Sequence, residues 1–463
     1  MIVSDEKVSI PQWRYAPDAW RWVKRFDERY AASVLRFRSA GILPQSMRAR
    51  FLAMGIHADI LESTLASIKS PEGWANAWIE TAQRFLGDYR RQVSAKQLLE
   101  AAQARRLAAL SYHCAQLFAA TDKRTVRTCR AAAASLFAQA QPYLYPNARP
   151  LMIPWRTYML TGYHQSPVGA PSRGGLVVVL NGSNSSKEES FDWAASFLRA
   201  GLSVLSLDIP GTGESSSVPV SAHDEDDLLD GVFEVMRHEP GVDLAQISVV
   251  GVSVGGNLAV RCAAYDRRLM SSVAVTPPFD LARWIGHGSP FLLRQLDDFS
   301  AVTAAGASTN MNHYSLHDVA PELKSPLLVF GAGHDLIISP AESQLLAARA
   351  GAIGTLIWYP ESGHGLYDSI PSWTAEAATW ISSVAAARAM EYQNSGFADP
   401  VQVAILAREQ LLAAGAMDDD FFDDEGSARL IELDDTPEPD DAGSYARMVT
   451  PPPRPEPSSN HAT

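Results

Sequence analysis

The chain has 463 residues, of which 46% are hydrophobic, so two or three domains with a large apolar core can form. Its net charge of −13 is uneven, with +10 on residues 1–150 and −10 on residues 416–463. No apolar run is long enough to span a membrane and the start lacks the pattern of a secretory signal, so we expect a cytoplasmic protein with no membrane partner. Three widely spaced cysteines predict reduced thiols rather than a disulfide or metal site.

The first part of the chain has the periodicity of helices and shows no strand pattern. In residues 74–85 apolar side chains recur at spacings of three and four, as on an amphipathic helix. Long helices are expected at 94–118 and from 121 to about 141, so residues 1–145 are predicted to form an all-helical cap domain. The expected breaks between helices are Pro44, Gly55, Ser70-Pro71 and Gly87. The arginines are scattered beside acidic residues, which favours a solvated surface over a nucleic-acid-binding one.

From residue 146 the pattern becomes that of an α/β sheet, which is expected to extend to residue 392. Segments 149–155 and 157–163 alternate as in a hairpin, and short apolar strands then alternate with helices. The strands are predicted at 175–180, 202–207, 247–250, 271–275, 327–330 and 355–359, and the helices at 191–200, 224–237, 257–264, 339–350 and 373–390. This alternation predicts a doubly wound, mostly parallel sheet with helices on both faces.

Three further segments complete the predicted organisation. Residues 276–324 form an aromatic-rich excursion that is expected to help roof the site. Residues 393–415 are expected to hold one extra helix. Residues 416–463 combine acidic blocks with prolines, which predicts a disordered tail. A solubilising role for this tail is favoured over a contact with the basic helical domain.

The predicted domain centres on residues 247–257, where a buried strand runs into a helix rich in alanine and leucine. Gly251-Val-Ser253-Val-Gly255 crosses the turn between them. A sharp strand-to-helix turn requires small neighbours and holds the serine hydroxyl clear of the sheet, at a helix N-terminus that favours negative charge. Ser253 is therefore the candidate nucleophile. Because many structural turns match this pattern, the prediction depends on the residues that follow.

An acid and a base follow later strands. Asp335 follows the strand at 327–330, and His364 lies between two glycines after the strand at 355–359. The order Ser253, Asp335, His364 is that of a triad on an α/β-hydrolase sheet, and all three follow strand ends, where open sheets place their sites. A helix cap and a polar turn are the structural alternatives for Asp335 and His364. His334 is the one competing base, and we expect no metal or other cofactor because the sequence shows no metal-ligand spacing and no glycine-rich nucleotide loop.

The candidate oxyanion hole is the loop that follows the strand at 175–180. The backbone N–H groups of Ser183 and Val254 are the predicted donors, and Gly182 lets the chain approach the substrate oxygen. Asp208 follows the next strand and is predicted to tie down a turn rather than to catalyse.

Residues 181–189, Asn-Gly-Ser-Asn-Ser-Ser-Lys-Glu-Glu, resemble the Gly-Gly-x-x-(Ser/Thr)-x-Lys-Glu-Glu stretch of one α/β-hydrolase branch. The helix around Tyr112-His113 and the nucleophile segment are similar to that branch too, and the likeness covers roughly residues 70–390. The branch includes FrsA-like esterases, dihydroxypseudooxynicotine hydrolase and fungal hydrolases that shorten polyketides. Asn181 replaces the first glycine of the motif, and Asn184 stands where the nicotine-degrading enzyme has a site glutamate.

The resemblance implies a helical cap, a Ser-His-Asp triad, often a homodimer, and hydrolysis of esters or ketone C–C bonds. We therefore expect a serine hydrolase for an apolar, aromatic or polyketide-like small molecule of secondary metabolism or catabolism. A non-hydrolytic catalyst of the same fold (a cyclase, epimerase or acyl transferase) and a non-enzymatic binding scaffold are the alternatives. Candidate substrate contacts are Asn181, Gly182, Asn184, Tyr112 and Trp284.

Overall fold

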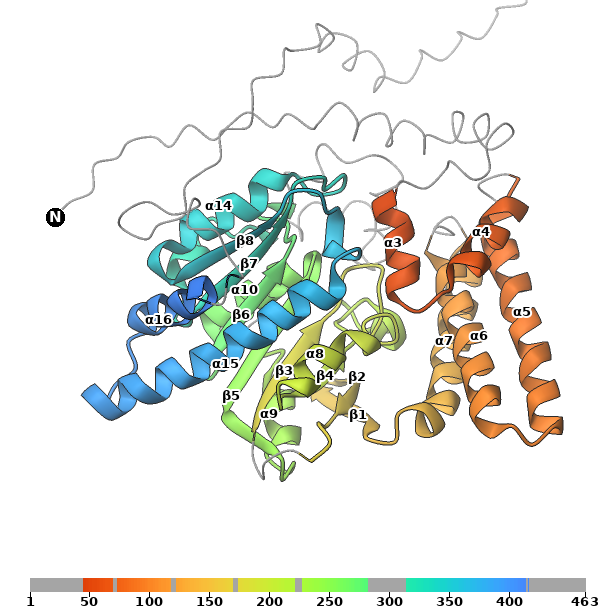
Figure 1. The fold of residues 1–463 in the computed structure, drawn as a ribbon, viewed down its shortest axis with the longest axis horizontal. Coiled ribbons are helices and arrows are strands. Elements are labelled where there is room, and N and C mark those ends of the chain that lie inside the picture. The colour runs from red at the N-terminus through yellow and green to blue at the C-terminus, as the bar shows by residue number, and fades with distance from the viewer. Residues whose placement is uncertain are drawn as a thin grey trace, which may run out of the picture. The chain divides into compact units, whose positions relative to one another are not determined.

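A computed structural model describes residues 45–69, 73–117, 122–169, 174–220, 227–281, 314–413 and 415. Its centre is an eight-stranded sheet in the order β1-β2-β4-β3-β5-β6-β7-β8. The six strands from β4 to β8 in this order pair in parallel, whereas the hairpin β1-β2 is antiparallel and joins β4 antiparallel (Figure 1). The predicted fold class, a mostly parallel doubly wound sheet preceded by a helical region, is confirmed.

The strands lie close to their predicted positions. Their bounds are β1 Ala148–Trp155, β2 Tyr158–Gln165, β3 Gly174–Leu180, β4 Ser203–Leu207, β5 Val242–Val252, β6 Ser271–Val275, β7 Leu327–Ala332 and β8 Gly354–Tyr359. β5 is longer than predicted, because Val242 at its start pairs with Gly174 across an irregular step in the register.

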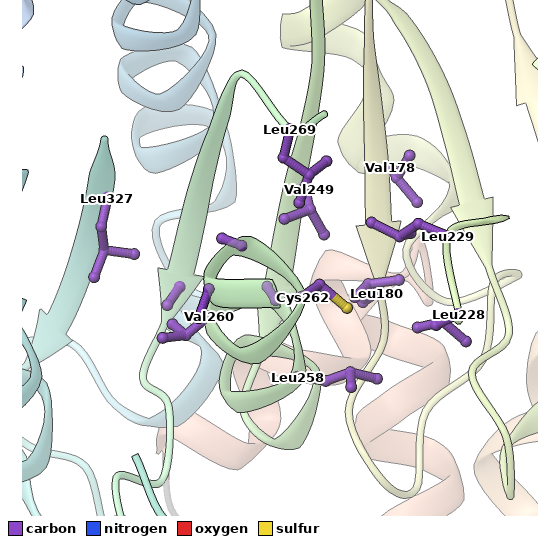
Figure 2. Packing of buried hydrophobic residues seen from close by; sticks show 14 of the residues in the cluster. Val178, Leu180, Leu228, Leu229, Val249, Leu258, Val260, Cys262, Leu269 and Leu327 are labelled. Carbon is purple, nitrogen blue, oxygen red and sulfur yellow. The ribbon is translucent and has the colours of Figure 1, made fainter. Parts of the chain in front are cut away.

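Alternate residues of the parallel strands face two separate apolar cores. In β3, Val178 and Leu180 belong to the core that contains α9 (Asp230–Met236), α10 (Val254–Tyr265) and α14 (Pro340–Ala350). Val177 and Val179 belong to the opposite core, with α8 (Ala194–Arg199) and α15 (Ile370–Ser395). Figure 2 shows Leu258, Val260 and Cys262 of α10 grouped with Val178, Leu180 and Val249 of the sheet. Burial on both faces explains why these strands are continuously apolar in sequence.

The helical region contains α3 (Gln45–Ala53), α4 (Ala58–Ser67), α5 (Gly73–Ser94), α6 (Leu98–Gln116) and α7 (Lys123–Leu144). The rings of Phe51, Trp74 and Trp78 pack together in its core. The predicted break at Gly87 is wrong, since this glycine lies inside α5. A glycine there costs about 1 kcal/mol relative to alanine, which a 22-residue helix tolerates.

Of the remaining predicted segments, the structure describes the extra helix but only part of the excursion. The extra helix is confirmed as α16 (Pro400–Ala413). Of the excursion, the structure describes only 276–281 and 314–324, so Trp284 and the predicted roof lie outside the described residues, as does the acidic tail at 416–463. Cys114, Cys129 and Cys262 are buried free thiols. Within the described ranges, no helix is both long and apolar enough to cross a bilayer.

Candidate active site

The turn between β5 and α10 holds Ser253 in a strained backbone conformation. Its φ of 57° and ψ of −123° lie where residues other than glycine are rare. A methyl group on Gly251 would lie 2.0 Å from the carbonyl oxygen of Gly255, and one on Gly255 would lie 2.4 Å from that of Leu180. Both contacts are with backbone, so only glycine fits at either position. A strained serine between two obligatory glycines at a strand-to-helix turn is the backbone geometry that a nucleophile elbow requires.

The candidate acid and base lie in contact. His364 Nδ1 is 2.7 Å from Asp335 Oδ2, and Asp335 is buried. The other carboxylate oxygen of Asp335 accepts the backbone N–H groups of Ile337 and Ile338 at 2.8 and 2.9 Å. These bonds fix the carboxylate, so a proton on His364 Nδ1 faces it and Nε2 is the ring nitrogen that could take a proton from a nucleophile.

The end of β6 connects the serine turn to the histidine loop. The backbone N–H of Ser253 donates to the carbonyl of Val275 at 2.9 Å, and the N–H of Gly365 donates to the hydroxyl of Thr276 at 3.0 Å. Ser253 and Gly365, the residue after His364, are therefore each hydrogen-bonded to one of two adjacent residues. The side chain of the competing base, His334, is 67% exposed, and its Nδ1 lies 3.8 Å from Glu361, which is itself 88% exposed. The geometry favours His364 over His334.

The candidate oxyanion loop passes directly beside the elbow. A methyl group on Gly182 would lie 3.6 Å from the Cβ of Ser253. The side chain of Asn181 is buried and accepts hydrogen bonds from the Ile209 N–H and the Thr212 hydroxyl, at 3.1 and 3.2 Å. Asn181 thus holds the loop, which favours a structural role over the substrate contact suggested by its position in the sequence.

The two predicted oxyanion donors occupy suitable backbone positions. Ser183 follows Gly182 in the loop, and Val254 is the first residue of α10. The first N–H groups of a helix lack an intrahelical acceptor, so the Val254 N–H is available to a substrate oxygen.

The other predicted substrate contacts are placed differently. Asn184 accepts a hydrogen bond from Arg50 Nη1 at 3.1 Å, which ties the loop to α3. Tyr112 lies in the core of the helical region, where its hydroxyl contacts Gln83 Nε2 at 2.6 Å. Nothing in these contacts brings Tyr112 to Ser253, whereas Asn184 is one residue from a predicted donor.

Glu189, the last residue of the Lys-Glu-Glu motif, pairs with the helical region. Both its oxygens accept from Arg50, Nε to Oε1 at 2.7 Å and Nη2 to Oε2 at 2.8 Å. His113 Nε2 and the Ser185 hydroxyl also lie within 2.8 Å of Oε2. Burial raises the pKa of Glu189, but Arg50 and His113 outweigh it and hold this pKa well below its ordinary value. The carboxylate stays ionised, and a buried ion pair joins the helical region to the loop after β3.

The other two motif residues face the turn after β4. The Lys187 ammonium lies 2.7 Å from Glu188, 2.9 Å from Asp208 and 2.6 Å from Glu214. Asp208 also accepts the backbone N–H groups of Lys187 and Glu214, so it ties down a turn as predicted. Burial lowers the pKa of Lys187, but the carboxylates around it raise that pKa well above its ordinary value.

Sequence reasoning did not identify Arg50 or Thr276, and it named His113 only as part of the resemblance. Lys187, Glu188 and Glu189 are three consecutive ionisable residues after an apolar strand, which indicates that they have buried partners. Arg50 lies 139 positions from Glu189 in the sequence, so motif spacing could not identify it as the partner. Across the ranges that the structure describes, no three His, Cys, Asp or Glu side chains gather as a metal site would require.

Comparisons with known proteins identify the family and the fold of the chain. The family described as Alpha/beta hydrolase family matches residues 177–457, and that described as Esterase FrsA-like matches residues 68–280. A solved structure of a 2,6-dihydroxy-pseudo-oxynicotine hydrolase aligns with a TM-score of 0.63 at 22% identity, over 72% of this chain and 94% of that one. At this identity the likeness concerns the fold.

Curated relatives match over shorter stretches. The 2,6-dihydropseudooxynicotine hydrolase of Paenarthrobacter nicotinovorans is 28% identical over 46% of this chain and 57% of its own. Hydrolyase poxO of Penicillium oxalicum is 31% identical, over 48% and 56%. Polyketide transferase grgF of a Penicillium species is 30% identical, over 24% and 39%. The chain thus spans little more than half the length of the first two. It belongs to the α/β-hydrolase family and is similar to the FrsA-like esterases within it.

Proposed function

We propose that this protein is a serine hydrolase that cleaves an ester or a ketone C–C bond in an apolar, aromatic or polyketide-like small molecule. The observation that carries the proposal is the 2.7 Å contact between His364 Nδ1 and Asp335 Oδ2. The loop that holds His364 is hydrogen-bonded to Thr276, and the carbonyl of the preceding residue, Val275, accepts the backbone N–H of Ser253. Hydrolases of this family, including a nicotine-derivative hydrolase, support the reaction class.

In the proposed mechanism the Ser253 hydroxyl attacks a substrate carbonyl while His364 Nε2 takes its proton. Asp335 keeps the imidazole in the required tautomer and stabilises the positive charge that forms on it. The N–H groups of Ser183 and Val254 bind the oxyanion, a contribution worth about 10²–10³ in rate for each donor. His364 then protonates the leaving group, and water, deprotonated by the same imidazole, releases the acid from Ser253.

The two candidate reactions differ only in that leaving group. An ester releases an alcohol oxygen, whereas a β-diketone releases an enolate carbon that takes the same proton. An enolate carbon would depend on His364 alone for this proton, because Asn184, whose amide oxygen accepts from Arg50, supplies no second acid. This favours ester cleavage within the proposal.

A second candidate function is acyl transfer, which one relative, a polyketide transferase, favours. The acyl-enzyme would then pass to an alcohol or amine in place of water. Incubation with a model ester in the presence of added alcohols separates the two: partition to free acid supports hydrolysis, and predominant formation of a new ester supports transfer. A cytoplasmic homodimer completes the proposal, and sedimentation of the purified full chain tests its oligomeric part.

Ser253→Ala tests the nucleophile against a panel of acyl esters and β-diketones. We expect the turnover of any accepted substrate to fall by about 10⁴-fold or more, as on removing a triad serine, with the melting temperature retained. Ser63→Ala, at an exposed position on α4, is the matched control and should keep full activity. Undiminished turnover in Ser253→Ala would remove the proposed mechanism.

A further inference from the structure

The residue directly after β6 has an unusual backbone conformation. Thr276 has φ +42°, and it is 1% exposed. A positive φ is rare for any residue with a side chain and is a genuine outlier for a β-branched one. Such strain persists only where the surrounding structure holds the residue firmly, and it is concentrated at functional sites.

Val275 and Thr276, at the end of β6, make hydrogen bonds to the segments that lead to or carry Ser253, Asp335 and His364. The N–H of Thr276 donates to the carbonyl of Phe330 in β7, the strand that leads to Asp335, at 2.8 Å. The neighbouring carbonyl, of Val275, accepts the Ser253 N–H at 2.9 Å. The Thr276 hydroxyl accepts the Gly365 N–H at 3.0 Å. One dipeptide thus touches the nucleophile turn, the strand before the acid and the histidine loop.

The histidine loop needs such an anchor because its own conformation is strained. Gly365 and Leu366 both have positive φ, of 74° and 49°. The loop is fixed on one side by the His364–Asp335 contact and by the His334 N–H, which donates to the Ser362 carbonyl at 3.0 Å. On the side of Ser253, the Thr276 hydroxyl anchors this loop by accepting the N–H of Gly365, the residue next to His364.

We propose that Thr276 is a positioning residue, whose hydroxyl sets the distance between the His364 imidazole and the Ser253 hydroxyl. It acts through the Gly365 N–H and does not touch the substrate. The inference rests on the proposed function, because it assigns Thr276 a role in the same proton transfer. Misplacement of a catalytic group by about 1 Å can cost about 10² in rate, so a single hydroxyl at this junction can govern turnover.

Three variants separate positioning from a purely structural role. Thr276→Val keeps the shape and removes the acceptor, and we expect kcat to fall about 10- to 100-fold with KM changed less than about threefold. Thr276→Ser restores the acceptor and should recover most of kcat. Thr374→Val is the matched control, because Thr374 is another 1%-exposed threonine whose hydroxyl bonds backbone, here the Ile370 carbonyl. It should lower the melting temperature and leave kcat unchanged. If Thr276→Val does not fold, Thr276→Ala removes the same hydroxyl.

The downfield proton resonance of His364 Nδ1–H provides a readout that does not depend on turnover. We expect Thr276→Val to shift or broaden this resonance and Thr276→Ser to keep it. Equal kcat in the Val and Ser variants, with the resonance unmoved, would overturn the inference. A wild-type protein without hydrolase activity would instead sink the proposed function, and the resonance would still decide whether Thr276 positions His364.

Discussion

The Ser253 elbow follows β5 and the loop at 184–189 follows β3, at the same edge of the sheet, but different interactions stabilise the two regions. At the elbow, Gly251 and Gly255 approach backbone so closely that only hydrogen atoms fit, and the bonds are between neutral backbone groups. In the loop, Glu189 is held by a bidentate pair with Arg50, and Lys187 is surrounded by carboxylates. The first region is defined by steric exclusion and the second by buried charge.

This difference predicts which changes each region tolerates and which it does not. Steric exclusion tolerates changes in pH and salt but no added atom, whereas a buried ion pair tolerates modest changes in shape but not the loss of one partner. Arg50, the partner of Glu189, also contacts the segment after His364, since its guanidinium lies 5.6 Å from the ring centre of Tyr367, three residues further on. α3 therefore packs against the histidine loop as well as against the loop at 184–189.

The largest effect is expected where an atom is added to the elbow. In Gly255→Ala the new methyl group would lie 2.4 Å from the Leu180 carbonyl and 2.5 Å from that of Asn181, so β3 and α10 must separate. We expect activity to drop by about 10³-fold or more, because the proposed oxyanion donors would move with these elements. The initial rate of hydrolysis of an ester that the wild-type protein accepts measures this loss of activity.

Gly87→Ala is the control for that variant. Its methyl group would meet only the Arg91 guanidinium, at 3.6 Å, on the surface of α5. We expect full activity and a gain of about 0.5–1 kcal/mol in the free energy of unfolding. Normal rates in Gly255→Ala would contradict the steric account of the elbow.

A smaller effect is expected where a buried charge loses its partner. Glu189→Gln removes the negative charge and leaves the 6%-exposed Arg50 uncompensated, which should cost about 3–5 kcal/mol of unfolding free energy. Urea denaturation measures the loss. The double variant Arg50→Met/Glu189→Met should regain part of it, because no unpaired charge remains.

The exposed pair Arg48–Glu62 gives the matched comparison on the same helix as Arg50. Arg48 is about one-quarter exposed and Glu62 about half exposed, so Glu62→Gln should cost less than about 1 kcal/mol. Equal losses of unfolding free energy in Glu62→Gln and Glu189→Gln would show that the buried Arg50–Glu189 pair stabilises the fold no more than an exposed pair does.

The smallest expected effect is a pH dependence that comes from Glu342 at the start of α14. Burial raises the pKa of Glu342 from 4.5 to about 8, although its Oε2 accepts the N–H groups of Phe279 and Asp280. Between these values the unfolded chain releases a proton that the folded chain keeps, so unfolding free energy falls as pH rises, by up to about 1.4 kcal/mol per pH unit.

Glu342→Gln should abolish this slope, since the amide oxygen can still accept both N–H groups and carries no proton to release. We expect wild type to lose about 2–4 kcal/mol relative to the variant between pH 5 and pH 9, measured by urea denaturation. Parallel pH curves for the two proteins would mean that Glu342 ionises normally.

Sequence patterns predict the steric region well and the charged region poorly. The glycines beside Ser253 carry a local signal, and Asp335 and His364 follow predicted strand ends, so the triad candidates could be named before the fold was known. Glu189 could be identified only as part of a motif. Its partner Arg50 lies on α3, and the contact depends on how the helical region packs, which no local pattern encodes.

One error has a clear physical origin. Gly87 was expected to end a helix from its residue type alone, yet α5 packs as one amphipathic element through Trp74 and Trp78 and continues past it. Tertiary packing there outweighs the local signal. The hydroxyl of Tyr112, a candidate substrate contact, lies beside Gln83, and its role in substrate binding stays a prediction.

Mass spectrometry after treatment with a fluorophosphonate tests the central claim most directly. The account predicts one adduct, on Ser253, that forms at least about a hundredfold more slowly in His364→Ala and is absent in Ser253→Ala. An unlabelled wild-type protein, or an adduct on another serine that survives both substitutions, would contradict it.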